Sequence, residues 1–391
     1  MIGVCIKYFH ANYGGMLQAY ATVSMLEKQG LNYELIQYEK KRTTVEKIRS
    51  LPRLLNRVLL NDKYETLKKR IGEKRHPEFA RNNGVRLAAF RKFEKEKFTK
   101  LSPVFVGYDG LCQGSRRYSA VITGSDQLWS PAGLPTNYYN LMFVPDDVLK
   151  ISLASSFGVT EIPWYQKKRT RQFLNRIEHV SMRENRGSEI VKELTGREVD
   201  TILDPVFFLS KEEWDQRVPD EKIISEPYVF AYFLGANPEY RSVVTKFAKQ
   251  KGLKVVALRH MDQYVPGDES FGDIAPYDVD PKYFLNLLRN AEYVFTDSFH
   301  GTAFSVINEK QFIVFNRYQE GSSVSKNSRI DTLCQNFGLE SRRYQPGKDL
   351  IELTSELIDY SVVSERFKQQ KQITDQYMSV VLTEIRARES Q

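Results

Sequence analysis

A histidine at a predicted junction of strand and helix is the strongest candidate for acid–base chemistry in this sequence. The stretch TDSFHGTAFSVI, residues 296–307, follows an apolar run and contains His300, one of five histidines in 391 residues. A helix N-terminus there would offer the amides of Gly301 and Thr302 to a phosphate, and a neighbouring imidazole can move a proton near neutral pH. We interpret His300 as catalytic, with Ser298, Gly301 and Thr302 as substrate contacts. The alternative is a neutral histidine that caps the turn.

A second polar loop, TGSDQLWSP at residues 123–131, has a composition typical of sugar recognition. Ser125, Asp126 and Gln127 supply hydrogen-bond donors and acceptors directly after an apolar run, and Trp129 offers a flat apolar wall. We treat Asp126 as a catalytic candidate that orients or deprotonates a hydroxyl, and the other three as substrate contacts. The alternative is that Asp126 caps a helix while Trp129 lies in the core.

Two further loops are candidates for binding an anion. In NYGG, residues 12–15, paired glycines let the backbone approach a ligand, so Asn12, Gly14 and Gly15 are predicted substrate contacts. The loop lacks the G-x-G-x-x-G pattern of dinucleotide sites, and the alternative is a tight turn. Arg183, in SMRE, can hold phosphate or carboxylate in a forked geometry. Its alternative is a surface ion pair with the next residue.

The sequence lacks the motifs of several other kinds of enzyme. The sequence contains no H-E-x-x-H, no Cys–His cluster, no Walker A loop and no G-x-S-x-G. We therefore expect no metal, and we do not favour P-loop or α/β-hydrolase chemistry.

The four candidate loops share a place in the predicted fold, because three follow a predicted strand and SMRE, at 181–184, is expected to be a short strand end. Ligands in open α/β sheets bind outside the carboxyl ends of the strands. The β-α-β pattern at the start indicates parallel sheets, and the pattern restarts after a charged stretch at 210–227. The expected strands cover residues 2–8, 33–38, 118–124, 150–158, 228–235, 253–260, 292–298 and 311–316.

This repetition predicts an α/β protein with two Rossmann-like domains that face a cleft. We place the first domain at residues 1–215, with a basic helical insertion at about 40–100, and the second at 216–363. The remaining stretch, 364–391, is expected to be a helix that packs back on the first domain.

Composition indicates a cytoplasmic protein. No apolar run approaches the ~20 residues needed to span a bilayer, and the N-terminus has no pattern of a signal peptide. Three cysteines, distant from one another, argue for a reducing compartment.

The basic charge is concentrated in one segment. Residues 40–100 carry 20 Lys and Arg against 7 Asp and Glu, a net of +13, whereas the whole chain has +8. Arg49, Arg53 and Arg57 lie one helical turn apart on a predicted amphipathic helix. We favour a solvated helical insertion, and the alternative is a surface that rests on anionic lipid or meets a phosphate-bearing substrate. Nucleic acid is not expected as a partner, since no recognised motif accompanies the charge.

Together the loops resemble those of the polysaccharide pyruvyl transferase family. The segments that match are, in order, NYGGMLQAYA, VITGSDQLWSP, ASSFG, SMRE, LDPVFFL and TDSFHGTAFSV. The resemblance implies the two-domain fold of GT-B-like glycosyltransferases. It also implies transfer of the carboxyethylidene group of phosphoenolpyruvate to a sugar, in the cytoplasm or at the inner membrane face, with no cofactor. Some family members carry an arginine two positions before the histidine, where this chain has Ser298. Arg183, Arg329 and Arg317 are the candidates to replace it.

The implied partners are therefore phosphoenolpyruvate and a saccharide acceptor, and a lipid-linked precursor is one of the forms that this acceptor could take. Two other classes compete with this interpretation. One is a glycosyltransferase that uses a nucleotide sugar on the same fold, and the other is a non-catalytic protein of polysaccharide assembly.

Overall fold

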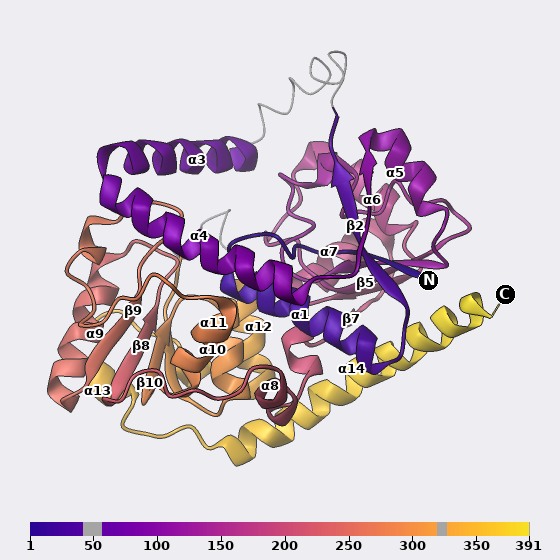
Figure 1. Ribbon diagram of the computed structural model, residues 1–391. Helices are drawn as coiled ribbons and strands as arrows, with labels where there is room; N and C mark the ends of the chain where they lie inside the picture. Colours follow the sequence, from indigo (N-terminus) through magenta and orange to yellow (C-terminus); the bar gives the residue numbers. More distant parts are fainter. Residues whose placement is uncertain (42–56, 319–326, 391) are drawn as a thin grey trace.

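The computed structural model describes residues 1–41, 57–318 and 327–390, and it has an α/β fold built on two parallel sheets (Figure 1). The larger sheet has seven strands in the order β3-β2-β1-β4-β5-β6-β7, and the smaller has four in the order β11-β10-β8-β9. Every strand pairing is parallel. The predicted α/β class with parallel sheets is confirmed.

The first sheet is formed within residues 2–201. Its central strands are short apolar runs that are wholly buried, as expected for a parallel sheet covered on both faces. The edge strand β3 was not predicted; it contains Pro103, which an edge position tolerates. The strands are β1 (Ile2–Cys5), β2 (Tyr33–Glu39), β3 (Leu101–Val106), β4 (Ala120–Gly124), β5 (Leu149–Ser155), β6 (His179–Met182) and β7 (Asp200–Thr201). The helices between them are α1 (Tyr13–Lys28), α3 (Arg57–Arg75), α4 (Pro77–Lys97), α5 (Gly107–Ser115), α6 (Lys167–Leu174) and α7 (Asn185–Thr195).

The second sheet is formed within residues 228–314. Its strands are β8 (Tyr228–Tyr232), β9 (Lys254–Leu258), β10 (Tyr293–Thr296) and β11 (Gln311–Val314). The helices of this half are α9 (Pro238–Lys251), α10 (Pro281–Arg289), α11 (Phe299–Ile307), α12 (Ser328–Phe337) and α13 (Leu350–Leu353). The short helix α8 (Lys211–Arg217) occupies the charged stretch before it, and its Trp214 is fully buried.

Helix α1 packs between the two halves. Asn12 caps its N-terminus by accepting a hydrogen bond from the amide of Gly15 at 2.8 Å. The hydroxyl of Tyr13 donates to the carbonyl of Val279 at 3.1 Å, and its ring stacks on Phe284 with centroids 4.8 Å apart. Every side chain from residue 13 to residue 26 is buried, so one helix of the first half belongs to the core of both.

The basic insertion also joins the halves, through α4. Phe90 and Phe93 of α4 are buried in the core beside α1. The buried guanidinium of Arg86 donates to the carbonyls of Arg259 at 2.6 Å and Pro276 at 3.0 Å, both in the segment after β9. Helix α4 therefore fastens the second half to the first, as its position across both in Figure 1 indicates.

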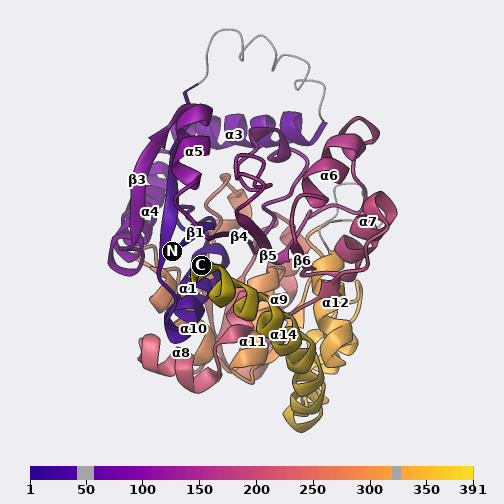
Figure 2. The ribbon, with the colours of Figure 1, turned by 90° about the vertical axis from the view of Figure 1, so that its right-hand side faces the viewer.

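Helix α3 lies at the edge of the molecule in both ribbon views (Figures 1 and 2). Arg49 and Arg53, predicted on an amphipathic helix, fall outside the described residues, as does the side chain of Arg57. Among the residues described, no helix is long and apolar enough to cross a membrane.

The long helix α14 (Tyr360–Glu389) returns from the second half to the first sheet (Figure 2). The hydroxyl of Thr374 accepts from the amide of Leu203 at 3.1 Å, and the hydroxyl of Tyr377 donates to the carbonyl of Ser152 at 2.7 Å. Its Ile385 is fully buried in the core.

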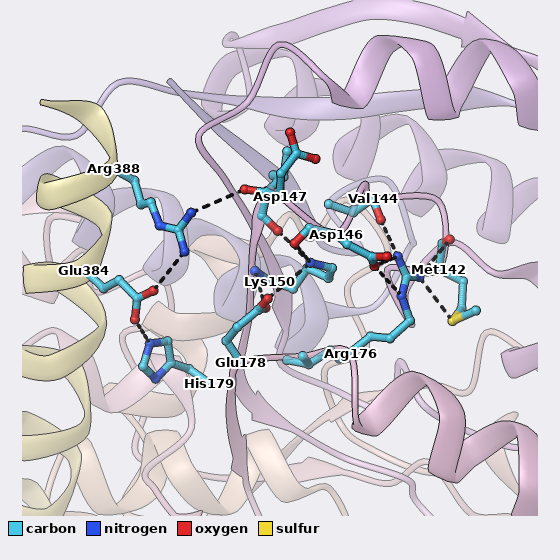
Figure 3. A network of polar contacts seen from close by, with 12 residues as sticks. Met142, Val144, Asp146, Asp147, Lys150, Arg176, Glu178, His179, Glu384 and Arg388 are labelled. Atoms are coloured by element: carbon cyan, nitrogen blue, oxygen red, sulfur yellow. Dashed lines mark hydrogen bonds and ion pairs between the residues drawn. The ribbon is translucent and has the colours of Figure 1, made fainter. Parts of the chain in front are cut away.

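A polar network fixes α14 at the amino ends of β5 and β6 (Figure 3). Glu384 of α14 bonds His179 at 2.6 Å. Nearby, buried Lys150 donates to the carbonyl of Val148 at 2.7 Å and pairs with Glu178 at 3.3 Å. Ligands of open sheets bind at the opposite, carboxyl ends, so we interpret this network as structural.

Candidate active site

A cavity of about 440 Å³ lies where loops from the carboxyl ends of both sheets meet. Its position agrees with the rule for open α/β sheets. Loops after β1 and β4 provide one wall, and loops after β8, β10 and β11 provide the other. The lining residues include Lys7, Asn12, Asp126, Gln127, Thr136, Tyr139, Asp297, Ser298, His300, Arg317 and Arg329.

His300 lines this cavity from the first turn of α11, as its sequence context predicted. Its Nε2 is buried without a hydrogen-bond partner among the described residues, and it lies 3.8 Å from Oδ2 of Asp204. That separation is an ion-pair distance and is too long for a hydrogen bond. On the other side Gly14 packs against the ring, since a Cβ at Gly14 would overlap the imidazole. The ring is thus held between α1 and a buried carboxylate.

Asp204 organises the buried side of the site. Its Oδ2 accepts from Ser125 Oγ at 2.9 Å and from a guanidinium nitrogen of Arg183 at 2.8 Å. Its Oδ1 accepts from the amide of Val206 at 3.1 Å. Burial would raise the pKa of Asp204, but the neighbouring His300 and Arg183 outweigh burial and hold that pKa well below its usual range. Asp204 is therefore an ionised carboxylate fixed by four groups.

Two arginines approach the same aromatic ring beneath the cavity. The guanidinium carbon of Arg183 lies 4.4 Å from the ring centroid of Phe299, and that of Arg329 lies 5.9 Å from it. Nε and one terminal nitrogen of Arg183, and Nε of Arg329, are buried without a hydrogen-bond partner in the described chain. Burial, and then the charge of Arg183, lowers the pKa of Arg329 to about 10. Two like charges with unpaired donors are the arrangement expected to receive an anion.

Asp126 faces this pair from the loop after β4. Its backbone adopts a left-handed φ of 55°, and its Oδ1 lies 3.7 Å from Arg183. Burial alone would raise the pKa of Asp126. Nearby positive charges, of which those of Lys7 and Arg183 have the largest effects, outweigh burial and lower this pKa. Asp126 is therefore ionised at neutral pH, which makes it a good hydrogen-bond acceptor and a weak base.

Several predicted contacts do not line the cavity. Trp129 is fully buried in the core against Phe157 and Phe173, so it forms no wall of the cavity. The amide of Gly301 donates to Ser298 Oγ at 3.2 Å and that of Thr302 to the Ser298 carbonyl at 3.0 Å, so neither is available for the predicted phosphate. Ser298 is the helix cap and itself lines the cavity.

The remaining predicted residues divide between lining and support. Asn12 and Gln127 line the cavity. Ser125 lies beneath it, and its hydroxyl proton is shared between Asp204 Oδ2 at 2.9 Å and the carbonyl of Ala154 at 2.7 Å. Gly14 leaves space for the imidazole of His300, whereas the amide of Gly15 donates a hydrogen bond to Asn12, the residue that caps α1.

Sequence reasoning missed Asp204, Lys7 and Asp297. For Asp204 a signal was present, because it lies in LDPVFFL, one of the segments that carry the family resemblance, but its partners come from distant segments. Asp297 accepts from the amides of Leu234 at 2.6 Å and Gly235 at 2.8 Å, and so joins the loops after β8 and β10. Lys7 was hidden within the first predicted strand, since β1 ends at Cys5.

The site therefore combines Arg329, an ionised Asp126 and His300 in the lining of one cavity, whereas Arg183 is buried behind the lining. Such a set can bind a small ligand with two anionic groups and can move a proton beside it. Within the described ranges, no group of three or more His, Cys, Asp or Glu side chains is placed to hold a metal ion.

Comparison with known proteins identifies both a family and a fold. A family model described as polysaccharide pyruvyl transferase matches residues 12–318, a span that includes every cavity residue named above except Lys7 and Arg329. No curated protein sequence matches the chain.

Solved structures support the fold. A crystal structure of a UDP-N-acetylglucosamine 2-epimerase is 12% identical, with 96% of this chain and 94% of that chain covered and a TM-score of 0.51. A protein assigned the same activity in Listeria monocytogenes is 12% identical, with 95% and 90% covered and a TM-score of 0.50. At such identities the likeness shows the fold alone, and it confirms the predicted GT-B-like architecture.

Proposed function

The chain belongs to the polysaccharide pyruvyl transferase family, and we propose that it transfers the carboxyethylidene group of phosphoenolpyruvate to two hydroxyls of a sugar, forming a pyruvate ketal. The observation that carries this proposal is the pair Arg183 and Arg329, whose buried guanidinium groups retain unpaired donors beside His300. Phosphoenolpyruvate has a carboxylate and a phosphate attached to the same carbon, so it needs two fixed positive groups close together.

Arg329 is our candidate for the arginine that some relatives carry in place of Ser298. It lines the cavity, and it shares the Phe299 ring with Arg183. Arg317 also lines the cavity, but on the side of Asp297, whose buried carboxylate holds the loop after β8. We assign Arg183 and Arg329 to the donor.

His300 acts as the acid and base in this scheme. The imidazolium, which lies 3.8 Å from Asp204, gives its proton to the methylene carbon of phosphoenolpyruvate as positive charge builds on the adjacent carbon. The first sugar hydroxyl bonds to that carbon and returns a proton to His300. His300 then protonates the departing phosphate, and the second hydroxyl closes the ring and gives up its own proton. The products are the ketal and inorganic phosphate.

Asp126 orients the attacking hydroxyl. Its lowered pKa makes it an acceptor of a hydrogen bond from the sugar, and the final proton transfer falls to His300. Lys7, which lowers that pKa, lies on the same wall of the cavity and balances the charge of Asp126.

The direct test uses oligosaccharides from the surface polysaccharide of the source organism, freed of existing ketals by mild acid. Incubation with phosphoenolpyruvate should release phosphate and should add to the acceptor the mass of pyruvic acid minus water. His300→Asn should lower turnover ~10²–10⁴-fold. The matched control is His76→Asn, because His76 stacks on Tyr264 outside the cavity. Release of a nucleotide from a nucleotide sugar, without reaction of phosphoenolpyruvate, would contradict the proposal.

We also propose that α3 rests on an anionic bilayer, where lipid-linked acceptors are found. Tyr64, Leu67 and Ile71 are 55%, 55% and 41% exposed and recur on one face, among five lysines and arginines between residues 68 and 75. The protein should sediment with anionic vesicles at low salt and be released at high salt. Leu67→Gln should weaken the binding, and Leu357→Gln, at an exposed site elsewhere, should not. Equal binding to neutral vesicles would rule this out.

A further inference from the structure

A second hollow, of about 530 Å³, adjoins the first. It lies at the carboxyl ends of β1, β2 and β3, and it shares Thr136 and Tyr139 with the cavity that contains His300. The two hollows are therefore neighbours that share part of one wall. We call this second hollow the aromatic subsite; its lining includes Tyr8, Phe9, Tyr38, Glu39, Glu94, Tyr138 and Tyr139.

The aromatic rings of this subsite are held in place and partly presented to solvent. Phe9 is 53% exposed, with its ring edge against Tyr8 at 5.2 Å. Tyr38 is half-buried and stacks on Tyr138 with centroids 5.6 Å apart and planes at 22°. The Tyr138 hydroxyl donates to the carbonyl of Ile36 at 2.6 Å, which fixes the lower ring of that stack.

The charges of the aromatic subsite are opposite to those of the main cavity. Glu39 is exposed and Glu94 is half-buried, and burial raises the pKa of Glu94. Lys40 is the single basic side chain among the lining residues. Carboxylates repel an anionic donor, but they accept hydrogen bonds from hydroxyls. Flat rings beside acceptors suit a pyranose, which has an apolar face of C–H groups and a rim of hydroxyls.

We propose that the aromatic subsite binds a second sugar unit of the acceptor, next to the unit that receives the pyruvate. The proposal rests on the proposed function for the identity of the acceptor, and it deepens it, because it makes the acceptor an oligosaccharide and not a single sugar. Phe9 is the main contact, since its ring is the most exposed in the subsite. The shared residues Thr136 and Tyr139 lie between the two sugar units.

The test compares acceptors of increasing length. Depyruvylated oligosaccharides from the same polysaccharide are separated by number of sugar units, and KM and kcat are measured for each. With the wild type, KM should fall sharply when the acceptor gains its second unit. Phe9→Leu keeps apolar bulk but removes the ring, and it should raise KM for the longer acceptors about tenfold. The KM for phosphoenolpyruvate and for the shortest acceptor should not change.

Two further variants distinguish the loss of ring stacking from a non-specific loss of enzyme function. Phe9→Trp retains an aromatic face and should keep the wild-type dependence on length. Trp164→Ala removes an aromatic side chain that is 82% exposed at a distant site, and it should also leave that dependence intact. An equal rise in KM for short and long acceptors in Phe9→Leu, or no rise for either, would overturn the proposal.

A binding measurement keeps this inference distinct from the reaction. Saturation-transfer NMR on the same oligosaccharides, without phosphoenolpyruvate, should show transfer to two neighbouring sugar units in the wild type and to one in Phe9→Leu. If no pyruvate is transferred to any acceptor, the proposed reaction fails, and this measurement still decides the subsite. Identical transfer in both proteins would refute it.

Discussion

Replacing Gly14 with alanine is the sharpest test of how the active site is assembled. Gly14 is the second residue of α1, and a Cβ there would overlap Cβ, Cγ and Nδ1 of His300. Either α1 or the imidazole must move until the atoms reach ordinary contact. A misplacement of ~1 Å in a reacting group can reduce the rate ~10²-fold, which corresponds to about 2.7 kcal/mol of transition-state stabilisation.

The same substitution should not weaken the fold through helix propensity. Alanine is favoured over glycine inside a helix by about 1 kcal/mol, which offsets part of the strain. We therefore expect kcat/KM to fall about 100-fold in Gly14→Ala while the free energy of unfolding changes by less than about 1 kcal/mol. The two quantities are measured by steady-state phosphate release and by urea denaturation.

The chain supplies a matched control at the next position. A Cβ at Gly15 would meet only the side chain of Asn12, with its nearest atom at an ordinary 3.5 Å. Gly15→Ala should therefore keep wild-type activity. Wild-type kcat/KM in Gly14→Ala, or an equal loss in both variants, would refute the view that Gly14 is small to admit His300.

Three other outcomes are expected. Arg183→Lys should raise the KM for phosphoenolpyruvate at least tenfold. A lysine ammonium lacks the planar guanidinium that can bond Asp204 and a ligand at the same time. Saturation curves identical to those of the wild type would show that Arg183 does not bind the donor. Arg86→Met should lower the free energy of unfolding by about 3 kcal/mol, since it strips two buried carbonyls of a charged donor, whereas Arg81→Met, at an exposed position of the same helix, should change it by less than about 0.5 kcal/mol. The pKa of Asp204 is lower in the folded state than in the unfolded state, so ionised Asp204 stabilises the fold. This contribution to the free energy of unfolding is fully present above the unfolded pKa of about 3.9 and is lost as the pH falls towards the folded pKa. The difference in unfolding free energy between wild type and Asp204→Asn, measured in urea from neutral pH downwards, should shrink below about pH 5, and a constant difference would contradict the assignment.

The fold was predictable because its strands are apolar runs that end at recognisable turns. The missed elements include β3 and α5, next to the basic insertion, and α8, in the charged stretch between the two predicted domains. The sequence of β3 lacks the continuous apolar pattern of a buried strand, because it contains Pro103 and the exposed Val104 and Val106. It forms a strand only through its pairing with β2 at the edge of the sheet.

The candidate site was predictable where a residue's own neighbours reveal its place. His300 and Asp126 follow strands directly, so their positions at the cavity could be inferred. The role of Asp204 could not, because its partners Ser125 and Arg183 come from other strands and meet it only in the folded core. Trp129 and the amides of Gly301 and Thr302 show the reverse. Both kinds of group suit a ligand, but Trp129 is packed in the core and the two amides donate hydrogen bonds to Ser298.

The return of α14 to the first sheet governs the order in which the chain can fold during synthesis. Thr374 and Tyr377 complete hydrogen bonds of segments made more than 170 residues earlier, and Val381 and Ile385 fill the core beside them. The ribosome makes these residues after both sheets, so an apolar face of the first sheet stays uncovered while the second half is translated. The nascent chain is therefore exposed to aggregation and to chaperone binding during that interval. Deletion of α14 should leave the N-terminal half insoluble, although the helix contributes no residue to the cavity.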